Sequence, residues 1–246
     1  TMGALHQGHA SLMQQSLQEN DLTMLSIFVN PTQFNDAGDL DKYPRTLEDD
    51  LKIASDLGVN AVFLPNAENM YPDGYEYRLT ETNRSAIMEG ESRPGHYDGV
   101  LTVVMKLLLL TGANRAYFGE KDYQQYVLIQ RMADAFFLAD TIKTQIIMCP
   151  IIREADGLAM SSRNVRLSAA GRQQAARFPQ ILRSASNAHA AEEQLRQAGF
   201  RVDYVTDTDA LAPTTQPAPT TQAAPTTQRR RFAAVFVEDV RLIDTM

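Results

Sequence analysis

Two histidines near the start of the chain, three residues apart, are the first side chains that could do chemistry. His6 and His9 stand in the segment TMGALHQGHASL, with Met2 and Gly3 before them and Gly8 between them. The segment predicts a loop that leads into a helix, whose N terminus offers unpaired N–H groups and the positive end of the helix dipole. Two imidazoles there could face one bound anion, and the glycines would let a nucleotide approach the backbone. Capping or surface histidines are the alternative.

A lysine in the segment YFGEKDYQQ (117–125) is the second candidate. The segment predicts a strand that ends at Gly119, followed by a helix that Asp122 could open. Lys121 would then lie at the carboxyl end of the sheet, where open α/β sheets bind ligands, and could pair with a phosphate. Asp122 could accept a hydrogen bond from a ribose or hold the water of a cation. An ordinary charged turn is the alternative.

Two hydroxyls followed by a guanidinium form the third candidate. Ser161, Ser162 and Arg163 lie together in the segment GLAMSSRN (157–164). They make a compact set of hydrogen-bond donors for phosphate. A polar turn without a ligand is the alternative.

Uncharged amides follow an early predicted strand. Asn30 and Gln33 lie in FVNPTQFN (28–35), just beyond the end of that strand. Amides in such a place could hydrogen-bond a small polar substrate. A glycine-containing loop further along the chain adds Arg93 and His96.

Strands that alternate with helices over the first part of the chain must position these side chains. Apolar runs rich in β-branched residues predict strands, and apolar residues that recur every three to four positions predict helices. This alternation indicates a parallel sheet covered by helices on both faces. We expect strands at 21–30, 59–65, 115–119 and 144–149, and helices at 46–58, 100–111 and 122–137.

The pattern changes near residue 150, which divides the chain into a parallel α/β domain, residues 1–150, and a smaller α+β domain, residues 151–246. An alanine-rich segment, 169–200, predicts helix that bends or breaks near Pro179. A low-complexity PTTQ insert at 212–229 is too rich in proline and threonine to bury a core, and we expect an extended loop. The strands of this domain are expected at 201–207, 231–237 and 240–244.

Composition limits the classes of partner. The 246 residues include 23 basic and 30 acidic residues, and the net charge of −7 disfavours general nucleic-acid binding. A single cysteine, Cys149, cannot form an internal disulfide, which is typical of a reducing compartment. No signal peptide is visible, and the longest apolar run, 100–110, is interrupted by Lys106 and is too short to span a bilayer. We therefore expect a cytoplasmic protein whose partners are small molecules, not nucleic acid or membrane.

The order of the motifs resembles that of the pantothenate synthetase family, within the HIGH-type nucleotidyltransferase superfamily. The match runs from Thr1 to about Leu167, and its specificity comes from several motifs in one order. The resemblance implies a Rossmann-like, doubly wound parallel sheet and a smaller C-terminal domain that closes over the ATP site. The motifs are HxGH, FVNPTQF, YPRT, MYPDG, GVLTVVMKLL, FGEKDYQQ and READGLAMSSRN, with RLID near the C terminus.

The resemblance also implies a reaction. ATP and pantoate form pantoyl adenylate and pyrophosphate, and the amine of β-alanine then attacks the adenylate to release pantothenate and AMP. ATP is a substrate, Mg²⁺ is required, and the family is typically homodimeric. No covalent intermediate with the enzyme is needed.

The ATP site follows from the resemblance position by position. His9 matches the residue assigned to general-acid or leaving-group duty. We prefer the interpretation that His6 and His9 stabilise the charge that builds on the departing pyrophosphate. Lys121 and Arg163 would carry most of the phosphate charge. The ATP-binding residues would be Met2, Gly3, His6, Gly8, His9, Gly119, Glu120, Lys121, Asp122, Ile152, Met160, Ser161, Ser162 and Arg163, with Ile152 as an adenine contact.

The resemblance places pantoate between two glutamines. Gln33 matches a glutamine that holds pantoate and lies beside the β-alanine position. Gln125 matches the other pantoate glutamine, and Asn30 would belong to the same substrate site. The resemblance assigns no residue as a ligand of Mg²⁺.

The sequence departs from the family at its start, because Thr1 lies inside the first motif. We expect the first, central strand of the doubly wound sheet to be absent, so that its neighbours lack a ladder partner. Two alternatives to the ligase follow. A truncated, non-catalytic paralogue would bind ligand without turnover, but His9, Lys121 and Arg163 argue against it. Another HIGH-type nucleotidyltransferase is disfavoured by the two glutamines, which suit a hydroxy-acid pocket.

Overall fold

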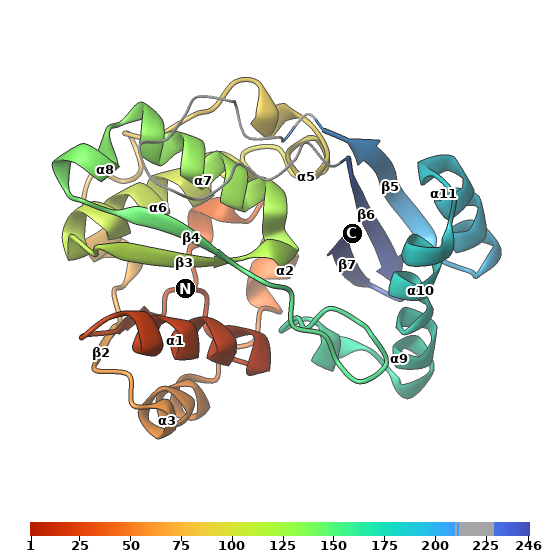
Figure 1. The fold of residues 1–246 in the computed structure, drawn as a ribbon, viewed down its shortest axis with the longest axis horizontal. Helices are drawn as coiled ribbons and strands as arrows, with labels where there is room; N and C mark the ends of the chain where they lie inside the picture. Colours follow the sequence, from red (N-terminus) through yellow and green to blue (C-terminus); the bar gives the residue numbers. More distant parts are fainter. Residues whose placement is uncertain (210, 212–228) are drawn as a thin grey trace. The chain divides into compact units, whose positions relative to one another are not determined.

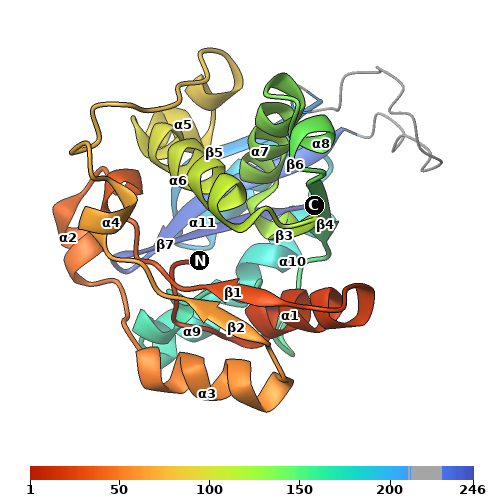
Figure 2. The same cartoon turned by 90° about the vertical axis from the view of Figure 1, so that its left-hand side faces the viewer.

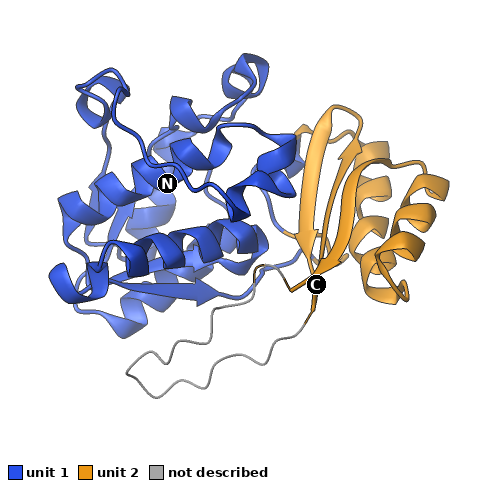
Figure 3. Cartoon of the chain, turned by 90° about the horizontal axis from the view of Figure 1, so that it is seen from above, with its two compact units in different colours: residues 1–154, 160–165 blue, residues 155–159, 166–246 orange. Residues whose placement is uncertain are grey.

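The structure, a computed structural model, describes residues 1–209, 211 and 229–246. The chain divides into two compact units (Figure 3). Unit 1 comprises residues 1–154 and 160–165, and unit 2 comprises residues 155–159 and 166–246. The segment 160–165, which contains the predicted phosphate-binding hydroxyls, therefore groups with unit 1. The predicted PTTQ insert lies outside the described residues, apart from Arg229.

Unit 1 contains two pairs of parallel strands. Strand β1 (Met24–Ser26) pairs with β2 (Ala61–Phe63), and β3 (Arg115–Gly119) pairs with β4 (Gln145–Cys149). Helices separate successive strands along the chain, as parallel pairing requires. The predicted α/β class with parallel strands and helices is confirmed.

The two strand pairs of unit 1 are separate sheets in the described part of the chain. Strand β1 is also much shorter than the predicted strand at 21–30, and Met24 is 54% exposed. A strand that is paired on one side only has fewer partners to extend it.

The helices of unit 1 pack around these strands (Figures 1 and 2). Apolar side chains of α6 and α7 form most of the core. Helix α1 contacts β3 on one side, and α7 packs against β3 and β4 on the other. The α-helices are α1 (Gln7–Glu19), α2 (Ala37–Asp41), α3 (Leu47–Leu57), α4 (Ala67–Met70), α5 (Glu89–Ser92), α6 (His96–Thr111), α7 (Tyr123–Ala135) and α8 (Leu138–Thr141). Short 3-10 helices are η1 (Pro31–Gln33), η2 (Arg84–Ala86), η3 (Glu120–Asp122) and η4 (Asn164–Arg166).

Among its described residues, unit 2 is an antiparallel sheet with three helices. Its strands follow the order β5 (Arg201–Thr208), β6 (Arg230–Val237) and β7 (Val240–Thr245). The helices are α9 (Ala169–Ala175), α10 (Arg177–Ser184) and α11 (Ala188–Gln197). The α+β class predicted for the smaller C-terminal part of the chain is thus confirmed.

The predicted helix break near Pro179 is confirmed, because α9 ends at Ala175 and α10 begins at Arg177. Pro179 lies inside the first turn of α10, where the missing N–H group has no intrahelical partner to lose. The break falls at Ala176, three residues before Pro179, and a second break, which was not predicted, falls over residues 185–187. The expected end at Gly199 is confirmed, because α11 stops two residues before it.

Two further observations bear on the predicted class of protein. Of the helices in residues 1–209, 211 and 229–246, none combines the length and the apolar character that a bilayer crossing needs. Cys149 is buried at the end of β4, and burial raises the pKa of its thiol to about 11. A thiol that stays protonated and buried is a packing residue rather than a nucleophile.

Candidate active site

A cavity of about 1460 Å³ in unit 1 gathers most of the predicted site residues. Gly3, Asn30 and Glu120 do not line it, although all three were predicted as site residues. The predicted residues that line it are Met2, His6, Gly8, His9, Gln33, Gly119, Lys121, Asp122, Gln125, Ile152, Met160, Ser161, Ser162 and Arg163. The structure therefore brings the segments 1–9, 119–125 and 160–163 to one place.

The histidine pair is built into the N terminus of α1. His6 is the N-cap residue, and its Nδ1 accepts a hydrogen bond from the Gly8 N–H at 3.1 Å. His9 Nδ1 in turn accepts from the His6 N–H at 3.3 Å, and the two ring centroids lie 4.0 Å apart. Because each Nδ1 accepts a hydrogen bond, each neutral ring holds its proton on Nε2. Both histidines can thus donate from Nε2 while they cap the helix.

Both imidazoles are neutral at physiological pH. Burial, and then the neighbouring His6, lower the pKa of His9 to about 3. Burial and the nearby Lys121 ammonium also lower the pKa of His6. A neutral imidazole donates a hydrogen bond but supplies no proton as a general acid. The electrostatic interpretation of the pair therefore fits this geometry better than the general-acid one.

The loop that leads into α1 has an unusual backbone. Met2, Gly3 and Ala4 all have positive φ, at 78°, 76° and 50°. A Cβ on Gly3 would lie 2.8 Å from the Oδ2 atom of Asp50. Gly3 is thus required by backbone conformation and close approach, and not by contact with the cavity.

Asp50, on α3, holds this loop and was not predicted as a site residue. Its carboxylate accepts hydrogen bonds from the N–H groups of Ala4 at 2.9 Å and Leu5 at 2.7 Å, and from the Thr46 hydroxyl at 3.1 Å. The residue is only 1% exposed. A sequence signal existed, since Asp50 falls at helical spacing from Leu47 and Ala54 on the apolar side of the helix.

The lysine segment follows β3, as predicted. The chain leaves Gly119, makes the short helix η3, and enters α7. Lys121 Nζ lies 3.5 Å from the Asp122 carboxylate, and both side chains line the cavity. Asp122 occupies the N-cap position of α7, but its side chain caps no N–H group. Gln125 lies in the first turn of α7 and reaches the same cavity.

The segment 160–165 contacts a tyrosine that the sequence analysis missed. Tyr43 lines the cavity, and its hydroxyl lies 3.2 Å from the Ser162 Oγ. Arg163 stacks over the Tyr43 ring and donates to the Asp39 carboxylate at 2.8 Å. Tyr43 belongs to the motif YPRT, so the motif held the signal. Arg163 is thus held by an ion pair that a bound anion could replace.

The two amide residues predicted for the substrate site lie in different places. Gln33 lines the cavity, whereas Asn30 is 1% exposed and lies behind it. The Gln33 carbonyl accepts from His96 Nδ1 at 2.8 Å. Burial, and then the Arg93 guanidinium, lower the pKa of His96 to about 4, so this imidazole is also neutral. Arg93 and His96 line the cavity beside Gln33.

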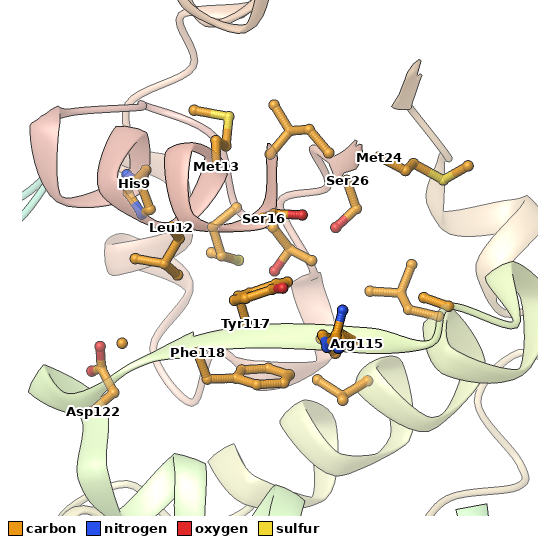
Figure 4. Close-up of a pocket in the computed structure, with 18 of the residues that line it drawn as sticks. His9, Leu12, Met13, Ser16, Met24, Ser26, Arg115, Tyr117, Phe118 and Asp122 are labelled. Atoms are coloured by element: carbon orange, nitrogen blue, oxygen red, sulfur yellow. The ribbon is translucent and has the colours of Figure 1, made fainter. Parts of the chain in front are cut away.

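The cavity also extends between the two strand pairs. Figure 4 shows side chains of α1, such as His9, Leu12 and Ser16, facing those of β3, with Met24 and Ser26 of β1 at the rim. Tyr117 of β3 contacts the end of α1, because its hydroxyl accepts a hydrogen bond at 2.7 Å from Nδ2 of Asn20, the C-cap residue of that helix. Arg115 is drawn at the end near Ser26, and Asp122 is drawn at the opposite end, on the side of His9.

Comparisons with known proteins agree on one family. The family model described as pantoate-beta-alanine ligase matches residues 1–246. A pantothenate synthetase of Bdellovibrio bacteriovorus is 46% identical over 249 residues, which cover 100% of this chain and 89% of that protein. A pantothenate synthetase of Coxiella burnetii is 46% identical over 246 residues, which cover 100% and 86%.

Solved structures give the same result. A pantoate-beta-alanine ligase from Francisella tularensis, complexed with beta-gamma ATP and beta-alanine, is similar with a TM-score of 0.85 and 40% identity. The similarity covers 100% of this chain and 86% of that one. A pantothenate synthetase from Thermus thermophilus has a TM-score of 0.86 and 38% identity, over 100% and 90% of the two chains.

Proposed function

The chain belongs to the pantoate-beta-alanine ligase family, and we propose on that premise that it condenses pantoate with β-alanine in an ATP-dependent reaction. A carboxylate oxygen of pantoate attacks the α-phosphorus of ATP, and pyrophosphate leaves. The amine of β-alanine then attacks the acyl carbon of the adenylate, the bond to AMP breaks, and the amine loses a proton. One observation carries the proposal: a single cavity is lined by two histidines, a lysine, an arginine and two serines that could bind phosphate, and by two glutamines.

The phosphates of ATP would lie at the N terminus of α1. His6 and His9 would donate from Nε2 to oxygens of the departing pyrophosphate. Lys121 and Arg163 would supply the positive charge, and Ser161 and Ser162 would add hydroxyl donors. Donors that are already oriented stabilise charge in the transition state without rearranging. The nucleotide would also contact Met2, Gly8, Gly119, Ile152 and Met160, which line the cavity.

The two glutamines would hold pantoate. Gln33 and Gln125 come from different segments and line the same cavity. Amides bind carboxylate and hydroxyl oxygens without bringing a competing charge into the site. Asn30 contributes from behind Gln33 instead of by direct contact, as its burial indicates. The Francisella ligase solved with ATP and β-alanine supports both as ligands here.

The family implies Mg²⁺, and the residues fit an ion that arrives with ATP. Within residues 1–209, 211 and 229–246, no group of three or more His, Cys, Asp or Glu could hold a metal. Mg²⁺ usually keeps several waters and binds through one or two carboxylates and the phosphates of its substrate. Asp122 offers a carboxylate beside Lys121 in the cavity. Bound there, the ion would offset phosphate charge.

A homodimeric state and a cytoplasmic location belong to the same proposal. They rest on the family and on the composition of the chain, with its single cysteine. Sedimentation equilibrium of the purified chain tests the dimer. A mass equal to one chain at micromolar concentration would contradict it.

Pyrophosphate release by the purified chain tests the activity. We expect release that requires ATP, Mg²⁺ and pantoate, and steady turnover only when β-alanine is added. Release without dependence on pantoate would instead indicate another nucleotidyltransferase. Binding of ATP and pantoate without release would indicate a non-catalytic paralogue. The comparisons favour neither of these alternatives.

A further inference from the structure

A chain of buried polar side chains runs behind Gln33. Asn30 and Tyr71 are 1% and 7% exposed. The Tyr71 hydroxyl donates to Asn30 Oδ1 at 2.7 Å, and Asn30 Nδ2 donates to Gln33 Oε1 at 3.1 Å. The cavity-lining amide is thus connected to a tyrosine that does not reach the cavity.

The Tyr71 hydroxyl and groups of Thr32 and Gly99 together determine which way the Asn30 amide points. The Thr32 N–H, which can only donate, faces Oδ1 at 3.4 Å, and the Thr32 hydroxyl donates to the same oxygen at 3.0 Å. The Gly99 carbonyl, which can only accept, faces Nδ2 at 3.3 Å. A reversed amide would set donor against donor and acceptor against acceptor in a buried place, which is costly.

The orientation of Asn30 in turn determines that of Gln33. Because Asn30 Nδ2 can only donate, the Gln33 side chain must accept this hydrogen bond with its Oε1 atom. Its NH2 group is then left for the cavity. We propose that Tyr71, acting through Asn30, is a positioning residue that makes Gln33 a hydrogen-bond donor toward the substrate.

The surroundings of Tyr71 keep its hydroxyl protonated. Lys106 Nζ lies 4.9 Å from the centroid of the ring and donates to the Met70 carbonyl at 2.8 Å. Burial raises the pKa of Tyr71, so the hydroxyl keeps its proton. Tyr75 meets the Tyr71 ring edge-on at 5.2 Å. These contacts hold the ring in place on two sides.

The close packing of the turn on α6 also depends on one glycine. A Cβ on Gly99 would lie 2.4 Å from the Thr32 carbonyl and 2.6 Å from the Gln33 N–H nitrogen. Only glycine allows this approach, which brings the Gly99 carbonyl to Asn30. Helix α6 therefore supplies the acceptor that holds the amide.

An amide that only donates selects its ligand by chemistry. It favours a carboxylate or hydroxyl oxygen, both of which pantoate carries, and it disfavours the ammonium of β-alanine. The inference rests on the proposed function, in which Gln33 binds pantoate. It goes further by assigning the orientation of the amide and the residues that set it.

Matched tyrosine variants test the inference. Tyr71→Phe removes the donor to Asn30, whereas Tyr75→Phe removes a neighbouring buried hydroxyl that has no hydrogen-bond partner among the described residues. Pantoate affinity is measured by calorimetry in the presence of an ATP analogue with an uncleavable α,β-bridge. We expect Tyr71→Phe to weaken pantoate about fivefold, the effect of one neutral hydrogen bond, and Tyr75→Phe to leave it unchanged. ATP-analogue affinity and thermal midpoint report whether each variant is folded.

A double-mutant cycle separates positioning from general damage. In a Gln33→Met background, Tyr71→Phe should have no further effect on pantoate affinity, because the amide that it orients is gone. Asn30→Asp, which cannot donate to Gln33, should weaken pantoate by about tenfold or more. Equal pantoate affinity in the Tyr71→Phe and Tyr75→Phe variants would overturn the inference, as would a full Tyr71→Phe effect without Gln33. If the unmodified chain binds no pantoate, the proposed function itself fails.

Discussion

Unit 1 and unit 2 hold themselves together in different ways. In unit 2, strand β6 lies between two antiparallel partners, and Ala233, Ala234 and Val235 are fully buried. In unit 1, the strands form two separate parallel pairs with a cavity that reaches between them. Unit 1 also places buried polar side chains, including Asp50 and Asn30, under the segments that line the cavity.

This difference between the units indicates where ligand binding and stability are coupled. In unit 2, apolar packing of a continuous sheet supplies stability. In unit 1, buried hydrogen bonds orient loops as well as stabilise them. Asp50 holds the main chain that leads to the histidines, and Asn30 holds the side chain of Gln33 in the cavity wall. Changes in unit 1 should therefore alter ligand binding, stability and pH response together. Equivalent changes in unit 2 should alter stability alone.

The largest expected effect is that of His9→Asn on chemistry. Asparagine can still accept from the His6 N–H, so the cap of α1 is kept, but the Nε2 donor is lost. We expect the adenylation rate to fall by about 100- to 1000-fold, as when an oxyanion donor is removed, with a much smaller change in ATP affinity. Single-turnover pyrophosphate release and ATP titration measure the two quantities.

The control for this variant lies in unit 2. His189 is exposed on α11 beside Glu193, and His189→Asn should change neither quantity. A loss of ATP affinity without a loss of rate in His9→Asn would contradict the assignment of a transition-state role.

The next effect is the loss of the loop anchor in Asp50→Ala. The variant leaves the N–H groups of Ala4 and Leu5 buried without their acceptor. We expect the free energy of unfolding to fall by about 3 kcal/mol and ATP affinity to weaken, because the same loop leads to the histidines. Urea unfolding and ATP titration measure both. Asp49→Ala, on the exposed side of the same turn, should cost less than about 1 kcal/mol. Equal losses in the two variants would show that Asp50 is no anchor.

The sequence predicted the units of the fold better than their edges. Strand β3 and helix α3 fall within a residue of their predicted ranges, because their periodicity and end signals are local. Strand β1 spans only three residues of the predicted range 21–30. The length of a strand depends on its neighbouring strands, which the local sequence does not show. The predicted break in the C-terminal helices falls at Ala176, three residues before Pro179, because a proline is compatible with a first helical turn.

The candidate site shows the same division between local and distant information. Motifs identified the segments that line the cavity, but not which members face it. Asn30 and Gln33 are three residues apart, yet one is buried and the other lines the cavity. Tyr43 was missed because its contact to Ser162 joins residues 119 positions apart. Contacts at such separation follow from the tertiary fold and not from a motif.

A fall in pH should destabilise unit 1 before it destabilises unit 2. The unfolded chain binds a proton at each histidine below about pH 6.5, but His96 in the folded chain stays neutral until about pH 4. Protons therefore favour the unfolded state in this window, and unit 1 should lose up to about 3 kcal/mol at this residue as pH falls from 6.5 to about 4. In unit 2, Arg231 lowers the pKa of the Asp207 carboxyl, so that pair is lost only at lower pH.

Hydrogen exchange of the full chain at several pH values, corrected for intrinsic rates, measures each unit separately. We expect protection in α6 and α7 to fall before protection in β6. His96→Asn should reduce the response of unit 1 between pH 6.5 and 4 without abolishing it, because the pKa values of His9 and His6 are also lowered in the folded chain, and His189→Asn should leave the response unchanged. A simultaneous loss of protection in both units would contradict the difference between them.

The smallest expected effect concerns an ion pair that competes with ligand. Arg163 donates to Asp39 at 2.8 Å, and a phosphate bound by Arg163 would have to replace this carboxylate. Asp39→Asn should therefore strengthen ATP binding by about two- to fourfold, the modest effect typical of a partly exposed pair. The matched change in unit 2 is Asp239→Asn, which removes the partner of Arg166 and should leave ATP affinity unchanged. Calorimetry with an uncleavable ATP analogue measures both. Weaker ATP binding in Asp39→Asn would mean that Asp39 orients Arg163 for the phosphate instead of competing with it.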